Sequence, residues 1–357
     1  MKDYSFWRGR RVFLTGHTGF MGGWLAIFLT RAGALVTGYA LVPQTNPSFY
    51  AATGLEARLH RSVIADIRDG QRIKDEMAAA DPEVVFHLAA QAIVSAAQVD
   101  PVHTYDVNVM GTIKVLEAAR GCQALRSVVV VTTDKVYKNN AWAWPYREID
   151  ELGGKEPYSS SKACADILLD AYRNVYLHSF NPGPAAVGLA SIRAGNIIGG
   201  GDWAQNRLVP DAVRGFVAGK PLVLRNPAST RPWQHVLDPF PGYLELAERL
   251  AADPAKYSSG WNFGPALEDC REVGVIAGHL CREWGGAARF EVELAAKFYE
   301  ERLLTLDCSK ARLELDWHPS WPVETAVART IEWYRAFYEK ADMWPMAQKH
   351  CAEIAGS

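Results

Sequence analysis

Two short groups of polar residues have the types and spacing that acid–base chemistry needs. Tyr158 and Lys162 are four positions apart, so on a helix their side chains lie on one face. The lysine charge would make the phenol more acidic, and the phenol could then exchange a proton with a substrate hydroxyl. In a chain with 14 tyrosines such a pair is easily a coincidence, so its weight comes from its place at the start of a predicted helix.

The second group is Thr133-Asp134-Lys135, directly after the apolar run 127–132. Thr133 could hydrogen-bond a substrate hydroxyl and Asp134 could be a general acid. Lys135 could be a general base where partial burial disfavours its charged form. A surface turn with a solvated Asp-Lys pair is the alternative, and the nearby Tyr158 and Lys162 weigh against it.

A glycine-rich turn, TGHTGFMG over 15–22, joins the first predicted strand to the first predicted helix. Its G-x-x-G-x-x-G spacing lets the backbone approach a pyrophosphate, and the helix N-terminus offers free N–H groups and a positive dipole. We therefore expect a dinucleotide here. Strand two ends at 39–42 without an acid to grip the adenosine ribose and without an arginine for a 2′-phosphate. This favours NAD over NADP and predicts a weak grip on the ribose.

The elements that must position these groups alternate between strand and helix. Strands are predicted at 11–15, 34–41, 62–65, 84–88, 127–132 and 188–193, and helices at 22–32, 71–80, 105–119 and 156–175. Nearly continuous apolar strands indicate a parallel sheet covered on both faces. With right-handed crossovers this is an α/β, doubly wound, Rossmann-like fold, whose chemistry lies at the carboxyl ends of the strands.

The character of the sequence changes after Ala194, where glycines and then Pro, Trp and Arg clusters follow. We predict a cofactor-binding domain over 1–195 plus about 235–263, since a helix at 237–250 and a strand at 261–263 could rejoin the sheet. A smaller substrate lobe would comprise about 196–234 plus 264–357.

Composition excludes several classes of protein. The chain has 357 residues, a formal net charge of −2 and no Lys/Arg block, so no nucleic-acid partner is expected. The start, 1–11, lacks the apolar segment of a signal peptide, and no apolar run is long enough for a bilayer, so no membrane partner is expected. The six cysteines form no C-x-x-C pair; we expect no metal site and a cytoplasmic protein with reduced thiols.

Short motifs over nearly the whole chain resemble the CDP-glucose 4,6-dehydratase family of extended short-chain dehydrogenases/reductases. They are FLTGHTG (13–19), GYAL (38–41), DIRD (66–69), VFHLAAQ (85–91), NVMGT (108–112), PYSSSK (157–162), IRAGNIIGGGDW (192–203), RPWQHV (231–236), WNFGP (261–265), LDCSK (306–310) and LDWHP (315–319), together with Asp134-Lys135. Lys135 distinguishes this family, because the related dTDP-glucose dehydratases have glutamate after the aspartate (T-D-E) at this position. One departure is Ser95, where the family usually has arginine, which puts substrate contacts near it in doubt.

The resemblance implies conversion of CDP-glucose to CDP-4-dehydro-6-deoxyglucose and water, with a hydride passed to NAD from C4 and returned at C6. Tyr158 would take the C4 hydroxyl proton, Lys135 the C5 proton, and Asp134 would protonate the leaving C6 oxygen. The implied NAD contacts are Gly16, Thr18, Gly19, Phe20, Met21, Gly22, Asp66, Ile67, Leu88, Ala89, Ala90, Gln91, Asn108, Thr132, Tyr158 and Lys162.

The implied substrate contacts are Asn196, Arg207, Leu208, Arg231 and His235. Arginine suits a diphosphate through its bidentate fork. Arg207 could instead be an ordinary surface arginine, and a packed structural role for His235 is favoured over a catalytic one. The resemblance also implies a homodimer through a four-helix interface, with the helices near 105–119 and 158–175 as candidates.

Two rival functions remain open. A sugar-nucleotide epimerase on the same fold would keep Tyr158 and Lys162 but would not need Asp134-Lys135. A Rossmann-like protein that only binds NAD could lose Tyr158 or Lys162 without penalty, and both are present.

Overall fold

The computed structural model describes residues 3–176, 186–293 and 304–356. Seven strands form one sheet in the order β10-β6-β5-β4-β1-β2-β3, with every neighbouring pair parallel. The strands are β1 (Arg11–Thr15), β2 (Leu35–Ala40), β3 (Arg61–Ile64), β4 (Val84–His87), β5 (Ser127–Val131), β6 (Gly188–Ala194) and β10 (Gly260–Phe263). The chain reverses direction across the sheet between β3 and β4, which confirms the predicted doubly wound, Rossmann-like α/β fold.

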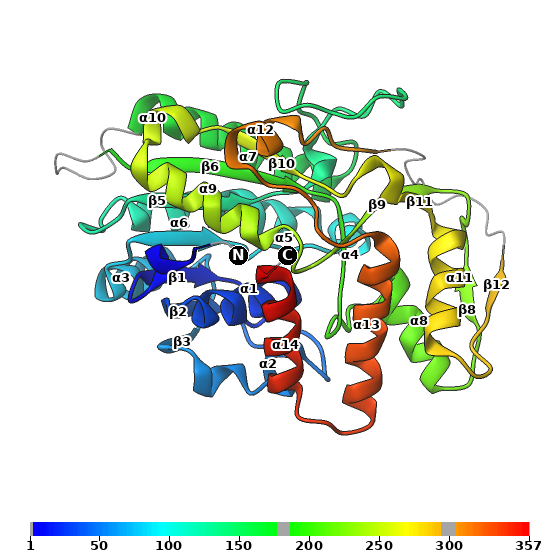
Figure 1. Cartoon of the computed structure of the whole chain (residues 1–357). Coiled ribbons are helices and arrows are strands. Elements are labelled where there is room, and N and C mark those ends of the chain that lie inside the picture. Colours follow the sequence, from blue (N-terminus) through cyan, green and yellow to red (C-terminus); the bar gives the residue numbers. More distant parts are fainter. Residues whose placement is uncertain (1–2, 177–185, 294–303, 357) are drawn as a thin grey trace.

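Helices cover both faces of the sheet (Figure 1). They include α1 (Phe20–Arg31) and α9 (Phe240–Ala252) on one face, and α3 (Gly70–Ala80), α6 (Thr112–Ala119) and α7 (Pro157–Tyr176) on the other. Because side chains alternate along a strand, Val12 and Leu14 enter the first core while Phe13 enters the second. Burial on both faces explains why the strands are apolar without interruption.

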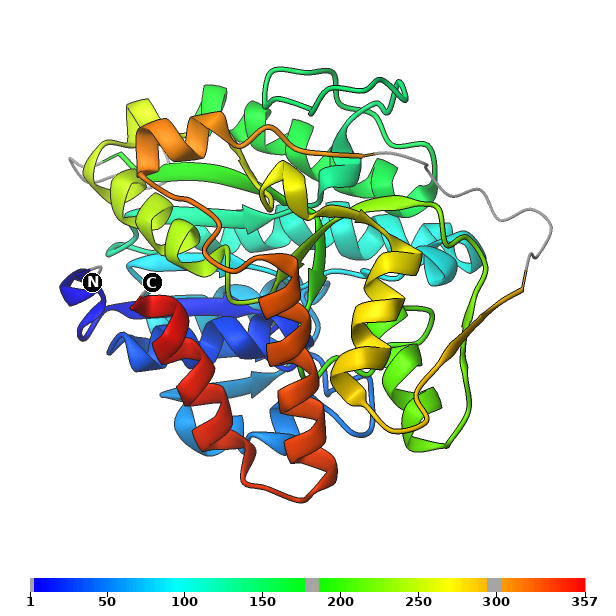
Figure 2. The same cartoon turned by 45° about the vertical axis from the view of Figure 1, so that its right-hand side comes forward.

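A second group of elements extends from one end of the sheet, on the right of Figure 1 and turned forward in Figure 2. Its strands form a three-stranded sheet β11-β9-β7 and a two-stranded sheet β12-β8. They are β7 (Asn196–Ile198), β8 (Leu222–Leu224), β9 (Thr230–His235), β11 (Cys270–Glu272) and β12 (Phe290–Val292). The associated helices are α8 (Leu208–Val217), α11 (Val273–Trp284) and α13 (Val323–Tyr338).

The division into a cofactor-binding domain and a substrate lobe stays a prediction. Some observations agree with its predicted boundaries and one does not. As expected, β10 rejoins the large sheet beside β6 and α9 packs on that sheet. The C-terminal helix α14 (Met343–Ala355), however, packs against α1 of the cofactor-binding part as well as against α13 (Figure 1). The remaining helices are α2 (Phe49–Ala52), α4 (Val94–Val99), α5 (Pro101–Tyr105), α10 (Pro254–Tyr257) and α12 (Ser309–Leu315). Among the described residues, no helix has the length and apolar character of a membrane span.

The prediction of one continuous α-helix over 105–119 is wrong, because a π-helical segment interrupts it. The structure has α5, then a π-helical segment Asp106–Gly111, then α6. The wider turn carries Asn108, whose amide nitrogen reaches Gln91 after β4 and Ser161 on α7. Such widened turns occur often at functional sites because they redirect a side chain. Hydrophobic periodicity alone does not reveal one.

Candidate active site

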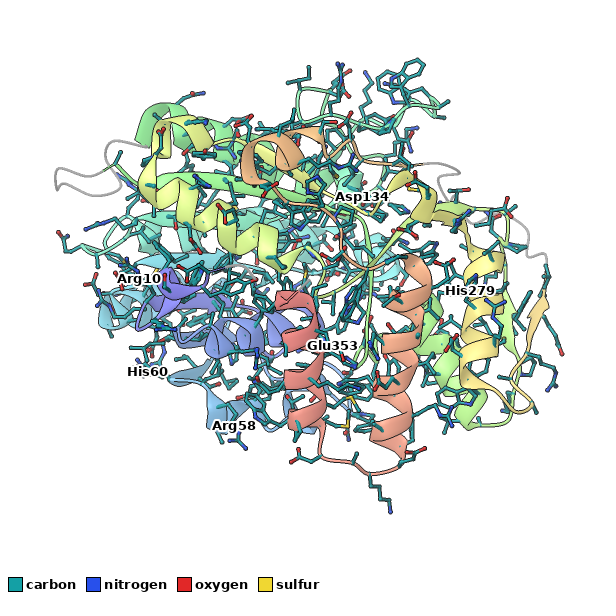
Figure 3. All side chains as sticks on the ribbon, in the orientation of Figure 1. Arg10, Arg58, His60, Asp134, His279 and Glu353 are labelled. Carbon is teal, nitrogen blue, oxygen red and sulfur yellow. The ribbon has the colours of Figure 1, made fainter. Side chains whose placement is uncertain are left out.

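Asp134 and Lys135 lie on a single 3-10 turn, Asp134–Val136, directly after β5 at the carboxyl end of the sheet. Asp134 is labelled near the middle of the molecule in Figure 3, while Arg10 marks the amino end of the sheet. Asp134 is only 1% exposed. Its Oδ1 accepts a hydrogen bond from Thr133 Oγ1 at 3.0 Å and lies 3.5 Å from Lys135 Nζ. Thr133 and Lys135 thus fix one carboxylate oxygen.

The other carboxylate oxygen of Asp134 is buried and has no hydrogen-bond partner among the described residues. Gly195, between β6 and β7, leaves room beside it. A Cβ atom at Gly195 would stand 3.4 Å from Asp134 Oδ2 and 2.7 Å from Pro232 Cγ on β9. A buried acceptor without a partner costs free energy, so this oxygen is suited to meet a group that a substrate brings.

Tyr158 stands in the first turn of α7, where Glu156 carboxylate oxygens accept from the backbone N–H groups of Tyr158 and Ser159 at 2.8 and 2.7 Å. This cap fixes the start of the helix. Burial raises the pKa of the Tyr158 phenol, while the Lys135 charge and a hydrogen bond with the Thr133 side chain act in the lowering direction. Tyr158, Thr133 and Lys135 are therefore brought together as expected.

Lys162 is buried one helical turn after Tyr158, and its Nζ donates to the Val131 carbonyl at 2.7 Å. Burial lowers the pKa of Lys162 to about 8, and the Asp166 charge opposes this shift. Lys162 was expected to acidify Tyr158. In the structure the lysine charge that lowers the Tyr158 pKa is that of Lys135. The i, i+4 spacing places Lys162 on the right face, but it cannot show that a backbone carbonyl takes the ammonium group.

The glycine-rich turn is folded tightly. Gly16 has a φ of +84°, and a Cβ there would stand 2.9 Å from the backbone nitrogen of Ala89. A Cβ at Gly22 would overlap the Gly16 carbonyl oxygen. No side chain caps α1, whose N-cap is Gly19, so N–H groups at its start are offered to an outside acceptor. Thr18, Phe20 and Met21 lie at this helix start. The turn fits the phosphates of a dinucleotide.

The segment after β4, Leu88 to Gln91, is held by its neighbours. Thr15 Oγ1 accepts from the backbone N–H groups of Leu88 and Ala89, each at 3.1 Å. The Asn108 amide accepts from the Gln91 backbone at 2.8 Å, donates to its carbonyl at 3.0 Å and donates to Ser161 Oγ at 2.9 Å. Asn108 is buried, so it ties the segment, with Ala90 in it, to α7.

The predicted adenosine end follows β2 and β3. Asp66 is held by Arg68, whose Nη2 and Nε donate to its carboxylate at 2.7 and 3.0 Å, and this arginine lowers the pKa of Asp66. Ile67 beside it is buried. No acid stands at the end of β2, where Leu41 is exposed and its carbonyl accepts from Thr18 Oγ1 at 2.8 Å.

The predicted substrate contacts separate into two kinds. Asn196 on β7 is paired in register with Trp233 on β9, and Arg231 precedes Trp233 on that strand. Arg207 directly precedes Leu208, the first residue of α8, and its Nη1 donates to the Asp202 carboxylate at 2.9 Å. The four predicted contacts in this group are partly exposed: Asn196, Arg207, Leu208 and Arg231.

His235 is of the other kind. It has no exposed surface, and its ring lies 4.8 Å from Trp321 and 6.3 Å from Trp24, measured between ring centroids. This position supports the structural role for His235 and argues against the substrate contact that the resemblance implied.

The sequence interpretation missed three residues at this site. Glu156 caps α7, and Arg193 forms a buried ion pair with Asp166 behind Lys162. A single arginine in the apolar strand 188–194 is a signal of a buried partner, although it does not identify one. Arg271 on β11 also lies directly opposite Arg231 on β9. Two positively charged residues thus lie at directly opposite positions of this strand pair.

The fold, the glycine-rich turn and the Tyr158/Lys162 pair define an extended short-chain dehydrogenase/reductase. The family model described as GDP-mannose 4,6 dehydratase matches residues 13–330, and the chain belongs to this family. CDP-glucose 4,6-dehydratase of Salmonella typhimurium is 45% identical over 343 residues, covering 96% of this chain and 95% of that protein. A dTDP-glucose 4,6-dehydratase of Xanthomonas campestris is 26% identical, covering 90% and 92%.

Solved structures with this fold include both epimerases and dehydratases. Epimerase Mth375 of Methanothermobacter thermautotrophicus superposes with a TM-score of 0.80 at 21% identity, covering 97% of this chain and 96% of that one. DesIV, a dTDP-glucose 4,6-dehydratase of Streptomyces venezuelae with NAD bound, gives 0.76 at 24% identity, covering 94% and 99%. The fold alone therefore does not separate the two activities.

Proposed function

We propose that the protein converts CDP-glucose into CDP-4-dehydro-6-deoxyglucose and water, with NAD as a bound cofactor that is regenerated in every cycle. The observation that carries the proposal is Asp134, with one buried carboxylate oxygen left without a described partner, next to Lys135 and close to Tyr158. An epimerase has no use for this acid–base pair. The 45% identical Salmonella dehydratase supports the same substrate.

NAD would be held by the Gly16–Gly22 turn, the Leu88–Gln91 segment and Asp66, and when bound it supplies the acceptor and donor of a hydride. Tyr158 removes the proton from the C4 hydroxyl, with Thr133 holding its oxygen. The C4 ketone acidifies the C5 proton, which Lys135 takes. Asp134 gives a proton to the departing C6 oxygen, and one water is lost. C6 then receives the hydride that left C4 and C5 receives a proton, so the sugar undergoes no net change in oxidation state.

We place the nucleotide diphosphate between β7, β9 and the start of α8. Arg207, Arg231 and Arg271 supply positive charge there, and Asn196 and Leu208 are their neighbours. Arg207 is oriented by Asp202, whose own backbone carbonyl accepts from the Tyr334 hydroxyl on α13. With the diphosphate there, we expect the sugar to extend toward Gly195, whose Cβ position would lie 3.4 Å from Asp134 Oδ2.

We further propose the homodimer with its four-helix interface, formed by the π-helical segment and α7 of the ranges predicted from the sequence. We add α4 and α5, which precede the predicted range 105–119 and contact α7. Four apolar side chains on them are strongly exposed: Val99 (87%), Val102 (78%), Met110 (46%) and Ile167 (54%). Burying such a patch against a second copy removes apolar surface from water. All six cysteines are free thiols, which supports a cytoplasmic location.

The test is incubation with CDP-glucose and NAD⁺, followed by mass spectrometry of the nucleotide sugar. Loss of one water is expected. Parallel reactions with dTDP-glucose, UDP-glucose and GDP-mannose test the base and the sugar. If CDP-glucose returns unchanged while another of these loses water, the CDP assignment is wrong. An isomer of unchanged mass would instead identify an epimerase.

A further inference from the structure

A buried ion pair lies behind the reacting side chains. Arg193 on β6 donates from Nε and Nη2 to the two carboxylate oxygens of Asp166 on α7, at 2.8 and 2.9 Å. The side chains of Asp166 and Arg193 are 0% and 4% exposed. Ser191 Oγ and Thr132 Oγ1 also donate to Asp166, at 2.7 and 3.2 Å. Asp166 therefore accepts four hydrogen bonds in the core of the protein.

This ion pair is connected to the site from two directions. Asp166 follows Lys162 by one helical turn, so the two side chains lie on the same face of α7. Thr132, which bonds Asp166, is the residue directly before Thr133. The Lys162 ammonium group donates to Val131, the last residue of β5. Asp166, Lys162 and the end of β5 thus hold one another in place.

The charges around Lys162 come from several elements. His87 on β4 is neutral at physiological pH, because burial, and next the Lys162 charge itself, lower its pKa to about 3. Tyr158 is protonated at rest, because burial raises its pKa. Asp134 follows β5. Arg193 on β6 is the ion-pair partner of Asp166. Asp166 is the negative charge on the same helix face as Lys162, and it opposes the burial that lowers the lysine pKa.

Arg193 determines the charge of Asp166 in turn. Burial alone would raise the pKa of this carboxyl, but the hydrogen bonds and charge of Arg193 hold it below its ordinary value. Arg193 is itself tied down, since its Nη1 donates to Tyr137 Oη at 2.9 Å and to the Glu148 carbonyl at 3.0 Å.

We propose that Asp166, kept ionised by Arg193, is a positioning residue that keeps the Lys162 ammonium group charged and seated against the end of β5 during proton exchange at Tyr158. The proposal rests on the proposed function, in which Tyr158 must pass through its anionic form. Lys135 supplies the charge that lowers the Tyr158 pKa, and a charged Lys162 one helical turn from Tyr158 adds a second positive charge that favours the anion, which a neutral lysine would not. Activity should therefore be lost as the pH rises and Lys162 loses its proton.

The test is Asp166→Asn, which keeps the size of the side chain and removes its charge. The alkaline limb of the kcat/KM pH profile should shift to lower pH by about 1 to 3 units, because Lys162 loses a nearby opposite charge. Asp170→Asn is the matched control, since Asp170 is one turn further along α7 and 61% exposed, and it should leave the limb in place. An unmoved limb in Asp166→Asn overturns the proposal.

A second measurement needs no substrate. The ¹⁵Nζ resonance of Lys162, assigned by its loss in Lys162→Met, should titrate at lower pH in Asp166→Asn than in the unsubstituted protein. Equal titration in both proteins refutes the role of Asp166. Inability of the unsubstituted enzyme to dehydrate CDP-glucose would refute only the proposed function, so the two failures are distinguishable.

Asp166→Asn leaves the buried Arg193 charge without its partner and could unfold the protein for that reason alone. Asp166→Asn with Arg193→Gln removes both charges. The alkaline limb of the double variant should still lie at lower pH than in the unsubstituted protein, because the Asp166 charge on the Lys162 face of α7 is gone. Full return to the original limb would mean that Asp166 serves only to neutralise Arg193, which contradicts the proposal.

Discussion

At the scale of single residues, the two oxygens of Asp134 have different surroundings. Oδ1 is fixed by Thr133 and Lys135, while Oδ2 is buried without a described partner. Leaving such an acceptor unsatisfied costs about 1 to 3 kcal/mol. A protein that only bound NAD would gain stability by filling this position with an apolar group. An enzyme in which Asp134 acts on a substrate has a reason to keep this unsatisfied carboxylate oxygen.

The first prediction separates the two halves of the reaction. Lys135→Ala should stop elimination, because the C5 proton has no base, with a fall in turnover of about 10²- to 10⁴-fold. Oxidation at C4 should persist more slowly, because the Lys135 charge also lowers the Tyr158 pKa. A single-turnover experiment should therefore show NADH absorbance without loss of water.

Lys138→Ala is the control for this prediction, since Lys138 is exposed, pairs with Glu151 at 3.0 Å and should leave turnover unchanged. No NADH signal in Lys135→Ala would contradict the assignment of separate roles to Tyr158 and Lys135.

At the scale of elements, the start of α1 depends on the contact of Gly22 with the Gly16 carbonyl. Gly22→Ala should force the turn open, destabilise the protein by about 1 to 3 kcal/mol and weaken NADH binding, measured by cofactor fluorescence. Gly278→Ala in α11 meets no atom within 4 Å and should instead stabilise by about 0.5 to 1 kcal/mol. NADH affinity unaffected by Gly22→Ala would disprove the assignment of this turn.

Features set by residues close together in the chain can be predicted from the sequence, and features set by residues far apart in the chain cannot. The glycine turn, Asp134-Lys135 and the i, i+4 pair on α7 are local, and each is found where it was expected. The partner of Arg193 and the lysine charge nearest Tyr158 depend on which strands become neighbours. The π-helical turn carries Asn108, whose side chain bonds Gln91 in the segment after β4. Such features need the packed structure.

At the scale of the whole molecule, the exposed apolar side chains on α4, α5 and α7 predict association. Val102→Glu would place a charge in the proposed interface and should convert the dimer to a monomer in light scattering after size-exclusion chromatography. Ile149→Glu is the control, because Ile149 is 82% exposed but lies outside these helices. A Val102→Glu protein that remains dimeric would exclude this interface.

Acid should destabilise the molecule through its buried histidines. Burial lowers the pKa of His17 to about 4, His87 to about 3, and those of His235 and His350 below the ordinary 6.5. The unfolded chain binds these protons first, so stability is complete above pH 6.5 and falls as the pH drops toward the folded-state values. Each histidine contributes a slope of about 1.4 kcal/mol per pH unit.

Urea unfolding over a range of pH measures that slope, and His350→Gln should reduce it by about one proton. A free energy of unfolding that stays constant below pH 6.5 would contradict this prediction.

The position of β10 has a consequence for the order of folding. It pairs with β6 across more than sixty intervening residues, so closing this edge carries a large loop entropy. On β10, Asn262 accepts from Tyr137 Oη at 2.7 Å and donates to the carbonyls of Tyr146 and Asp307. During synthesis the N-terminal strands can pair long before this amide exists. Pulse-labelled hydrogen exchange should find β10 protected last, and the active site would then be braced only when nearly all of the chain has been made.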